Sequence, residues 1–237
     1  MNASTKPIIS GDLLKFQPFI NYESILCTYF PDSNLKINAA CMGVHFTPTD
    51  EVYIHAYANT HTRDLLSKGV RFSINFSEDF FEYVMAALRR KDHMNFIDEL
   101  PRSAFIITES IPILKSAWVI LECEVLDLPS SLIDRPVCKR REVPNIRAKV
   151  LSKNIYRLPQ VFNNRSFNLS LEALILATRI PLYERYSDFY NDAIRTYNII
   201  KKKIISWRDM DRFHAAYEVI DNYLIENGVE PQELSFF

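Results

Sequence analysis

The sequence predicts an α+β protein in which a small closed antiparallel β-barrel precedes a helical segment. Over most of the first 160 residues apolar and polar side chains alternate, as they do in half-buried strands. From residue 168 onward apolar side chains recur with helical spacing instead. Strands followed by helices are typical of the α+β class, and short helices between the strands favour a barrel over a sandwich. We expect the barrel over residues 15–160 and the helical segment, packed on the barrel, over residues 161–237.

The expected strands are rich in β-branched and aromatic residues and are bounded by turn residues. The alternation is clearest in 69–76, where Arg71, Ser73 and Asn75 are expected to face out of the barrel. In 36–47 the same pattern places Met42, with the apolar residues two and four positions later, inside. The expected strands are 22–29, 36–47, 51–58, 69–76, 117–125 and a weaker one at 147–156.

Two helices are expected between these strands. One covers residues 62–68, and the other extends to Leu88 with Ser77 as its N-cap and Asp79 in its first turn. Residues 127–145 contain three prolines and the basic run 139–141, and they are expected to form a long surface loop. A solvated loop explains these charges better than an RNA or phosphate site, because no aromatic residues alternate with them.

About three helices are expected in the C-terminal segment. Pro181 ends the first, and the second follows Ser187 with Phe189 on its buried face. Ser206 is expected to cap the third, and Gly228 lies just past its end.

Composition excludes several classes of protein. Only 4 of the 237 residues are glycine, where average usage would give about 17. Neither the dinucleotide-binding fingerprint nor the P-loop motif occurs, so a Rossmann NAD enzyme and a P-loop NTPase are excluded. The net charge of −1 gives no reason to expect nucleic acid or an anionic membrane as a partner. Without an apolar leader in residues 1–19 or paired cysteine spacing, we expect a cytoplasmic protein with reduced thiols.

No classical metal or nucleophile motif is present. His45 and His55 could meet across neighbouring strands, but no pair of histidines has the spacing of a zinc helix, and no metal is expected. Cys41 lacks activating neighbours in the sequence and is expected to be a small buried apolar residue.

Residues 59–64 form a candidate anion site. They follow an expected strand and open a short helix, so free N–H groups, two hydroxyls and a guanidinium come together at a helix N-terminus. Helix capping by Thr60 or Thr62 would explain the same residue types.

Four segments in order resemble one known family. They are YESILCT at 22–28, NAACMGV at 38–44, THTRDL at 60–65 and NFSED at 75–79. Together they resemble a family of uncharacterised, mainly archaeal flavoproteins with the flavin reductase-like, FMN-binding split barrel. FNNRS at 162–166, leading into LEALILATRI at 171–180, is similar to the second signature of that family. The resemblance covers residues 20–225.

This resemblance implies a homodimer with FMN at or near the subunit interface. Strand 38–43 would run alongside the isoalloxazine ring and offer it backbone hydrogen bonds, residues 60–62 would hold the phosphate, and Asn75 would close the pocket. Arg179 could serve an ion pair with Glu172, a dimer contact or the FMN. The implied FMN-binding residues are Asn38, Ala39, Cys41, Met42, Gly43, Thr60, His61, Thr62, Asn75, Arg165 and Arg179.

The sequence departs from the family pattern at three places. Cys41 stands where the family has proline, which adds a backbone N–H, and Asp64 stands where it has asparagine. The second signature is lengthened by one asparagine within residues 162–165.

Two functions remain open at this point. One is an FMN-dependent oxidoreductase with an unknown small-molecule electron donor and acceptor, in which the cofactor carries the chemistry and no catalytic side chain is required. The other is a non-catalytic flavin-binding or vestigial split barrel that acts as an interaction module. A different planar cofactor, haem or a deazaflavin, is a third possibility.

Overall fold

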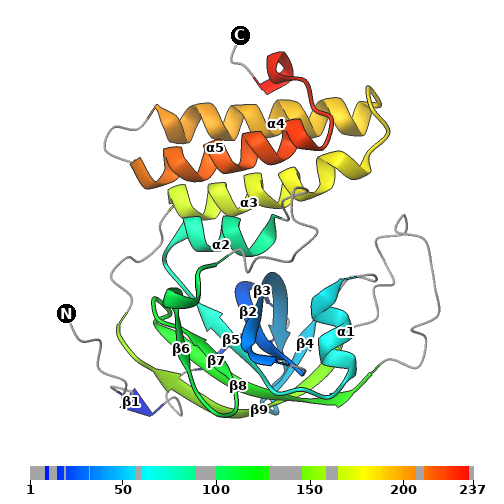
Figure 1. The fold of residues 1–237 in the computed structure, drawn as a ribbon. Helices are drawn as coiled ribbons and strands as arrows, with labels where there is room; N and C mark the ends of the chain where they lie inside the picture. Colours follow the sequence, from blue (N-terminus) through cyan, green and yellow to red (C-terminus); the bar gives the residue numbers. More distant parts are fainter. Residues whose placement is uncertain are drawn as a thin grey trace. The chain divides into compact units, whose positions relative to one another are not determined.

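The computed structural model describes residues 9–10, 15–18, 20–31, 33–56, 60–88, 100–128, 146–158, 165–206 and 211–234. The chain divides into two compact units (Figure 1). The first comprises Met1–Glu78 and Leu100–Pro159, and the second comprises Asp79–Glu99 and Gln160–Phe237. The first unit contains the strands and the second is helical.

Six antiparallel strands close into a barrel in the first unit. They are β2 (Asn21–Phe30), β3 (Ser33–Phe46), β4 (Glu51–Ile54), β5 (Phe72–Phe76), β8 (Val119–Asp127) and β9 (Ile146–Ile155). The order is β9-β4-β3-β2-β5-β8, and pairing of β8 with β9 closes the barrel. The short strand β1 (Ile9–Ser10) adds to β9. The predicted closed barrel is therefore confirmed.

The barrel interior is apolar because every second residue of each strand points inward. The alternation in β3 predicts that Met42, Val44 and Phe46 point into the barrel, and all three are buried there. Phe16, which precedes β2, stacks on Phe46 with ring centroids 4.0 Å apart. The interior-facing residues include Leu26, Val44, Phe46, Val52, Ile54, Phe72, Ile74, Val119, Leu121, Ile146 and Ala148.

A second, two-stranded sheet covers part of the outer face of the barrel. It consists of β6 (Phe105–Ile107), preceded by a 3₁₀ turn, and β7 (Pro112–Leu114), which packs on β2 and β5. Ser73 and Asn75 point out of the barrel as expected, but this hairpin buries both completely. The Ser73 hydroxyl donates to the carbonyl of Pro112, and the amide of Leu114 donates to Asn75 Oδ1.

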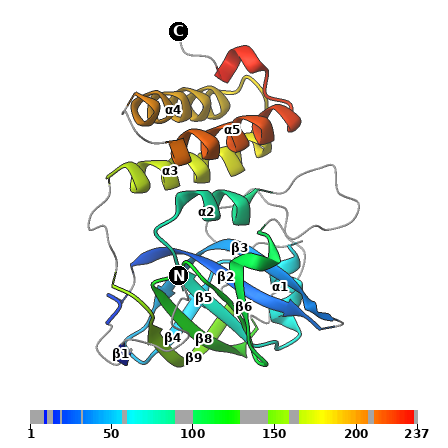
Figure 2. The ribbon, with the colours of Figure 1, turned by 60° about the vertical axis from the view of Figure 1, so that its left-hand side comes forward.

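The helix α1 (His61–Ser67) lies between β4 and β5 in the sequence and packs against β2 and β3 (Figure 2). It starts one residue earlier than the sequence predicts. The expected loop at 127–145, with the basic run 139–141, falls almost entirely outside the described residues, and so do Cys138 and His93.

The second unit contains four helices in the part of the chain that the structure describes. They are α2 (Phe80–Ala87), α3 (Arg165–Arg179), α4 (Asp188–Ile205) and α5 (Asp211–Glu226), with 3₁₀ turns at Ile180–Leu182 and Pro231–Leu234. Although α2 comes from the middle of the sequence, it packs on α3 and α5, and Phe80 stacks on Phe213 at 5.4 Å. Gly228 has a φ of 96°, as a helix C-terminus requires.

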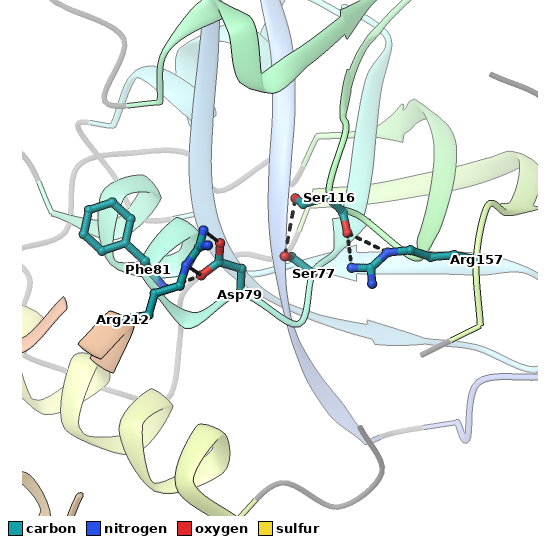
Figure 3. A network of polar contacts seen from close by, with 6 residues as sticks. All are labelled: Ser77, Asp79, Phe81, Ser116, Arg157 and Arg212. Carbon is teal, nitrogen blue, oxygen red and sulfur yellow. Dashed lines mark hydrogen bonds and ion pairs between the residues drawn. The ribbon is translucent and has the colours of Figure 1, made fainter. Parts of the chain in front are cut away.

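The prediction that Ser77 caps α2 is wrong, because the N-cap is Asp79. Asp79 Oδ1 accepts the amide of Phe81 at 3.1 Å, and the Arg212 guanidinium pairs with the same carboxylate (Figure 3). A carboxylate interacts better than a hydroxyl with the positive end of a helix. Ser77 instead contacts the hydroxyl of Ser116 at 3.5 Å.

Two further details of the helical unit, the role of Ser206 and the position of Phe189, differ from the prediction. Ser206 is the C-cap of α4, and α5 begins at Asp211. Phe189 is 77% exposed, and Tyr190 occupies the buried position instead. The buried face of α3 is made mainly of small residues, because α3 is flanked by neighbours on more than one side. That face consists of Ser166, Ser170, Ala173, Leu174 and Ala177.

Candidate functional site

In the part of the chain that the structure describes, the middle of β3 has a neighbouring strand on one side only. β2 pairs with β3 from His45 back to Ile37. β4 has only four residues, and its pairing with β3 is restricted to Val44, His45 and Phe46. Within the described residues, therefore, no strand pairs with 38–42 on the β4 side. This stretch coincides with the strand that the family resemblance places beside a flavin.

Two hydrogen bonds define which main-chain groups point to this open edge. Gly43 O accepts the amide of His55 at 3.3 Å, on the β4 side. Met42 O accepts the Ser24 hydroxyl at 3.0 Å, on the β2 side. Because the N–H and C=O groups of successive residues in a strand point to opposite edges, those of Ala39 and Cys41 face the open edge. They offer donors and acceptors to the polar rim of a flat ligand.

Gly43 marks the outer face of the barrel beside this edge. Gly69 and Gly228 have positive φ values of 69° and 96°, which explains why they are glycine. Gly43 has no such conformation, and a Cβ there would make only ordinary contacts, at 3.5 Å from Glu23 Oε1 and 3.6 Å from Asn21 Nδ2. Neither the backbone nor packing requires glycine here. Glycine within a strand often marks close approach of a ligand or of another backbone.

Cys41 lies next to Gly43 on the same outer face and contacts an acidic side chain. Its Sγ lies 3.7 Å from Glu23 Oε2, and Glu23 is directly opposite Gly43 on β2. Burial, reinforced by the charge and hydrogen bond of Glu23, raises the pKa of the Cys41 thiol well above its usual value. The thiol is therefore protonated at neutral pH and is no nucleophile.

Two histidines and a tyrosine stand on the other side of Gly43. His45 and Tyr53 are cross-strand partners with stacked rings at 5.1 Å, and the rings of His45 and His55 are 5.2 Å apart. The predicted meeting of His45 and His55 is confirmed. Burial lowers the pKa of both histidines, and the charge of His45 lowers that of His55 further. Tyr53 was not among the residues predicted for the site. Its position in the apolar–polar alternation of β4, two residues before His55, nevertheless indicates that it faces outward beside His55.

The predicted phosphate residues lie at the first turn of α1. Thr60 is the N-cap, and its Oγ1 accepts the amide of Arg63 at 3.3 Å, so it performs the capping role considered as the alternative. Thr62 is buried, and its Oγ1 accepts a hydrogen bond of 3.0 Å from Asn38 Nδ2. The ring of His61 contacts Phe30 at 6.2 Å. The structure thus brings Asn38 together with Thr62.

Two other predicted residues of the barrel unit, Asn75 and Met42, lie away from the open edge. Asn75 is separated from β3 by β2, and its Nδ2 donates to Ile25 O at 3.0 Å and to Ser73 Oγ at 2.8 Å. The side chain of Met42 belongs to the barrel core. Arg165 and Arg179 are the first and last residues of α3 in the helical unit, about 21 Å apart along its axis. Asn163 and Asn164 lie outside the described residues.

A shallow depression of about 260 Å³ lies elsewhere on the barrel unit. None of the residues that the family resemblance assigns to FMN binding lines this depression. Its lining residues are Tyr29, Phe30, Pro31, Val70, Arg71, Glu109 and Ser110. In the described part of the chain, three or more His, Cys, Asp or Glu side chains nowhere come together as a metal site. Among the described helices, none could cross a membrane.

A closed six-stranded antiparallel barrel with an open strand edge and C-terminal helices defines a flavin reductase-like split barrel. A family model described as the N-terminal domain of a protein of unknown function, DUF447, matches residues 22–153. The chain belongs to this family. No curated protein matches the sequence.

Several solved structures are similar to this chain. An FMN-bound DUF447-family protein from Methanosarcina mazei is 22% identical, with 86% of this chain and 94% of that chain covered and a TM-score of 0.61. The flavin reductase of styrene monooxygenase from Pseudomonas putida S12 is 16% identical over 57% of this chain and 80% of that one, with a TM-score of 0.42. Flavoredoxin of Desulfovibrio vulgaris (Miyazaki F) is 11% identical, with 62% of this chain and 76% of that chain covered and a TM-score of 0.42.

Proposed function

We propose that this protein binds FMN against the outer face of β3 around Gly43 and acts as an FMN-dependent oxidoreductase. The observation that carries the proposal is a glycine that neither backbone nor packing explains, next to an open strand edge. A protein of the same family and fold, from Methanosarcina mazei, is FMN-bound. When bound, FMN would supply electron and hydride chemistry, and the chain would supply binding and orientation.

The residues present fit a flavin mononucleotide. The main-chain groups of Ala39 and Cys41 can bind the polar rim of the ring, and Gly43 leaves the strand surface flat beside them. Asn38 and the first turn of α1 lie about 17 Å from Gly43 along the strand, at 3.3 Å per residue. The ring would therefore lie over the part of β3 between Asn38 and Gly43, and residues 60–62 would bind the phosphate beside Asn38. Asp64, the departure from the family pattern, is exposed.

A homodimer belongs to the same proposal. Ala39, Cys41 and Gly43 are only half-buried within one chain. A second copy seated on this face would shield the ring from water, which strengthens polar interactions with it.

The binding half of the proposal is tested by a Gly43→Ala variant. The added methyl group has room in the free protein, so circular dichroism and the urea midpoint should be unchanged. It would stand on the surface that the ring is proposed to cover, and we expect the dissociation constant for FMN to rise at least about tenfold, or 1.4 kcal/mol. The matched control is Ser152→Thr, which adds one methyl group to β9 and should bind FMN like the unmodified protein.

The result that would overturn the proposal is simple to obtain. If the unmodified protein, mixed with FMN and desalted, retains no yellow colour, flavin binding fails. If Gly43→Ala binds FMN as well as the unmodified protein does, the flavin lies elsewhere. Mass spectrometry of the extracted ligand identifies a different planar cofactor.

The oxidoreductase half is tested anaerobically on the flavin-loaded protein. Reduced nicotinamide should bleach the flavin absorbance, and an electron acceptor should restore it over repeated cycles. A bound flavin that no reduced nicotinamide bleaches would favour the non-catalytic flavin-binding module instead.

A further inference from the structure

The outer face of the barrel continues from Gly43 into a row of three polar rings. The amide of His55 bonds to the carbonyl of Gly43, which places His55 directly across from Gly43 on the β4 side. His45 follows Gly43 by two positions on β3 and therefore lies on the same face. Tyr53 pairs with His45 across the strands. The row thus borders the surface that the proposed function assigns to the flavin.

The rings of His45, Tyr53 and His55 stand side by side on the outer face of the barrel. The planes of His45 and Tyr53 are within 18° of parallel, and those of His45 and His55 differ by 43°. Side chains of a strand stand roughly perpendicular to the sheet, so imidazole nitrogens and a phenolic hydroxyl project from the half-buried row. These groups donate hydrogen bonds to an oxygen atom of a ligand.

Charges around the row favour a neutral ligand over an anion. Arg147 on β9, the cross-strand partner of Tyr53, pairs with Asp127 on β8 at 3.1 Å and with Glu51 on β4 at 3.8 Å. Glu23 on β2 and the Cys41 thiol face the same surface from the other side, and Lys149 on β9 is exposed. Arg147 is therefore already neutralised. The imidazoles are mainly uncharged at neutral pH because burial disfavours their charged forms.

We propose that His45, Tyr53 and His55 bind the carbonyl oxygen of a quinone-type electron acceptor and that an imidazole of this row protonates it. The inference rests on the proposed function and names its substrate class and catalytic residues. The acceptor gains a hydride equivalent from the reduced cofactor and one proton from the minor, protonated form of an imidazole, which makes it a hydroquinone. The imidazole regains its proton from water, and a reduced nicotinamide supplies the two electrons for the next cycle.

Two acceptors separate this role from a merely structural one. The flavin-loaded protein is reduced anaerobically, and reoxidation by 1,4-benzoquinone and by ferricyanide is followed by stopped flow. Ferricyanide accepts electrons without accepting a proton. We expect His45→Gln/His55→Gln to slow reoxidation by benzoquinone about 100-fold, as for loss of a general acid, and to leave the ferricyanide rate unchanged. Tyr53→Phe should weaken benzoquinone binding alone.

The pH profile and a matched histidine variant complete the test. With the unmodified protein the benzoquinone rate should fall from pH 6 to pH 8, because the acid form of an imidazole is lost, and in the double variant it should be flat. His214→Gln, which replaces an exposed histidine on α5, should behave like the unmodified protein. If the double variant does not fold, the single variants His45→Gln and His55→Gln carry the test.

The outcomes distinguish the two proposals. A double variant that retains FMN and reacts with benzoquinone at the original rate and pH dependence overturns this inference and leaves the proposed function standing. Equal slowing with both acceptors also overturns it, since the row would then act on the flavin rather than on the acceptor. Failure of the unmodified protein to retain FMN removes the proposed function, and this inference with it.

Discussion

The side-chain amide of Asn38 donates a hydrogen bond of 3.0 Å to Thr62 Oγ1 and thereby joins β3 to α1. Asn38 lies in the part of β3 with which no described strand pairs on the β4 side, and Thr62 is 2% exposed. A buried hydroxyl needs a hydrogen-bond partner, and here the partner comes from the strand beside the proposed flavin surface. The bond therefore ties the first turn of α1, where the phosphate is proposed to bind, to β3.

Removing the acceptor should destabilise the barrel unit. Thr62→Val keeps the shape of the side chain but leaves the Asn38 amide without this partner, so we expect the free energy of unfolding to fall by about 1–2 kcal/mol. Thr62→Ser retains the hydroxyl and should cost less. Urea unfolding of Thr62→Val, Asn38→Ala and the double variant gives the coupling energy, expected at about 0.5–1.5 kcal/mol. A coupling energy of zero would show that the bond contributes nothing to stability.

Asn75 should prove essential to the fold. Its amide bonds to Ile25 O and Ser73 Oγ, and its Oδ1 accepts the amide of Leu114, all in a fully buried position. Asn75→Ala leaves buried main-chain groups on two strands unpaired, each at a cost of about 1–3 kcal/mol. We expect the urea midpoint to fall sharply. Asn222→Ala, at an exposed position of α5, is the control and should unfold like the original protein. An unchanged midpoint for Asn75→Ala would mean that water replaces these bonds.

The interior of the barrel could be predicted from the sequence, but its covering could not. Alternation in β5 places Phe72, Ile74 and Phe76 inside because a barrel core excludes polar groups. The same alternation says only that Ser73 and Asn75 point outward. The hairpin that buries them has two strands of three residues each, too short for a periodic signal. Its bonds run to residues almost 40 positions away.

The capping error has a similar cause. Ser77 and Asp79 are both good N-cap residues by type. The difference between them comes from Arg212, 133 positions later in the sequence, which pairs with Asp79. No local pattern contains that partner.

The candidate site was only partly visible in the sequence. Strands with alternating side chains at 36–47 and 51–58 are enough to bring His45 and His55 to one face, and Gly43 stood out through the family resemblance. The open edge was not predictable, because it depends on β4 ending at Ile54 rather than continuing through His55 and Ala56. The residue types at 55 and 56 suit a strand equally well, so no local pattern marks this end.

The histidine pair should make the barrel sensitive to mild acid. The pKa values of His45 and His55 are lowered in the folded protein, first by burial and for His55 also by His45. In the unfolded chain both have the ordinary pKa of about 6.5. As the pH falls through 6.5, the unfolded state binds protons that the folded state does not bind, so the free energy of unfolding decreases. Below the folded-state pKa values the loss levels off.

Urea unfolding at pH 8 and pH 5.5 measures this loss. Carboxylates also titrate over that range and change the free energy of unfolding of every variant. The informative quantity is therefore the difference between variants in the free energy lost from pH 8 to pH 5.5. His45→Gln/His55→Gln should lose less free energy of unfolding between the two pH values than the original protein does. His214→Gln, whose side chain is exposed on α5, should lose as much as the original protein. If the double variant is as acid-sensitive as His214→Gln, the two imidazoles titrate alike in the folded and unfolded states, and the row is open to solvent.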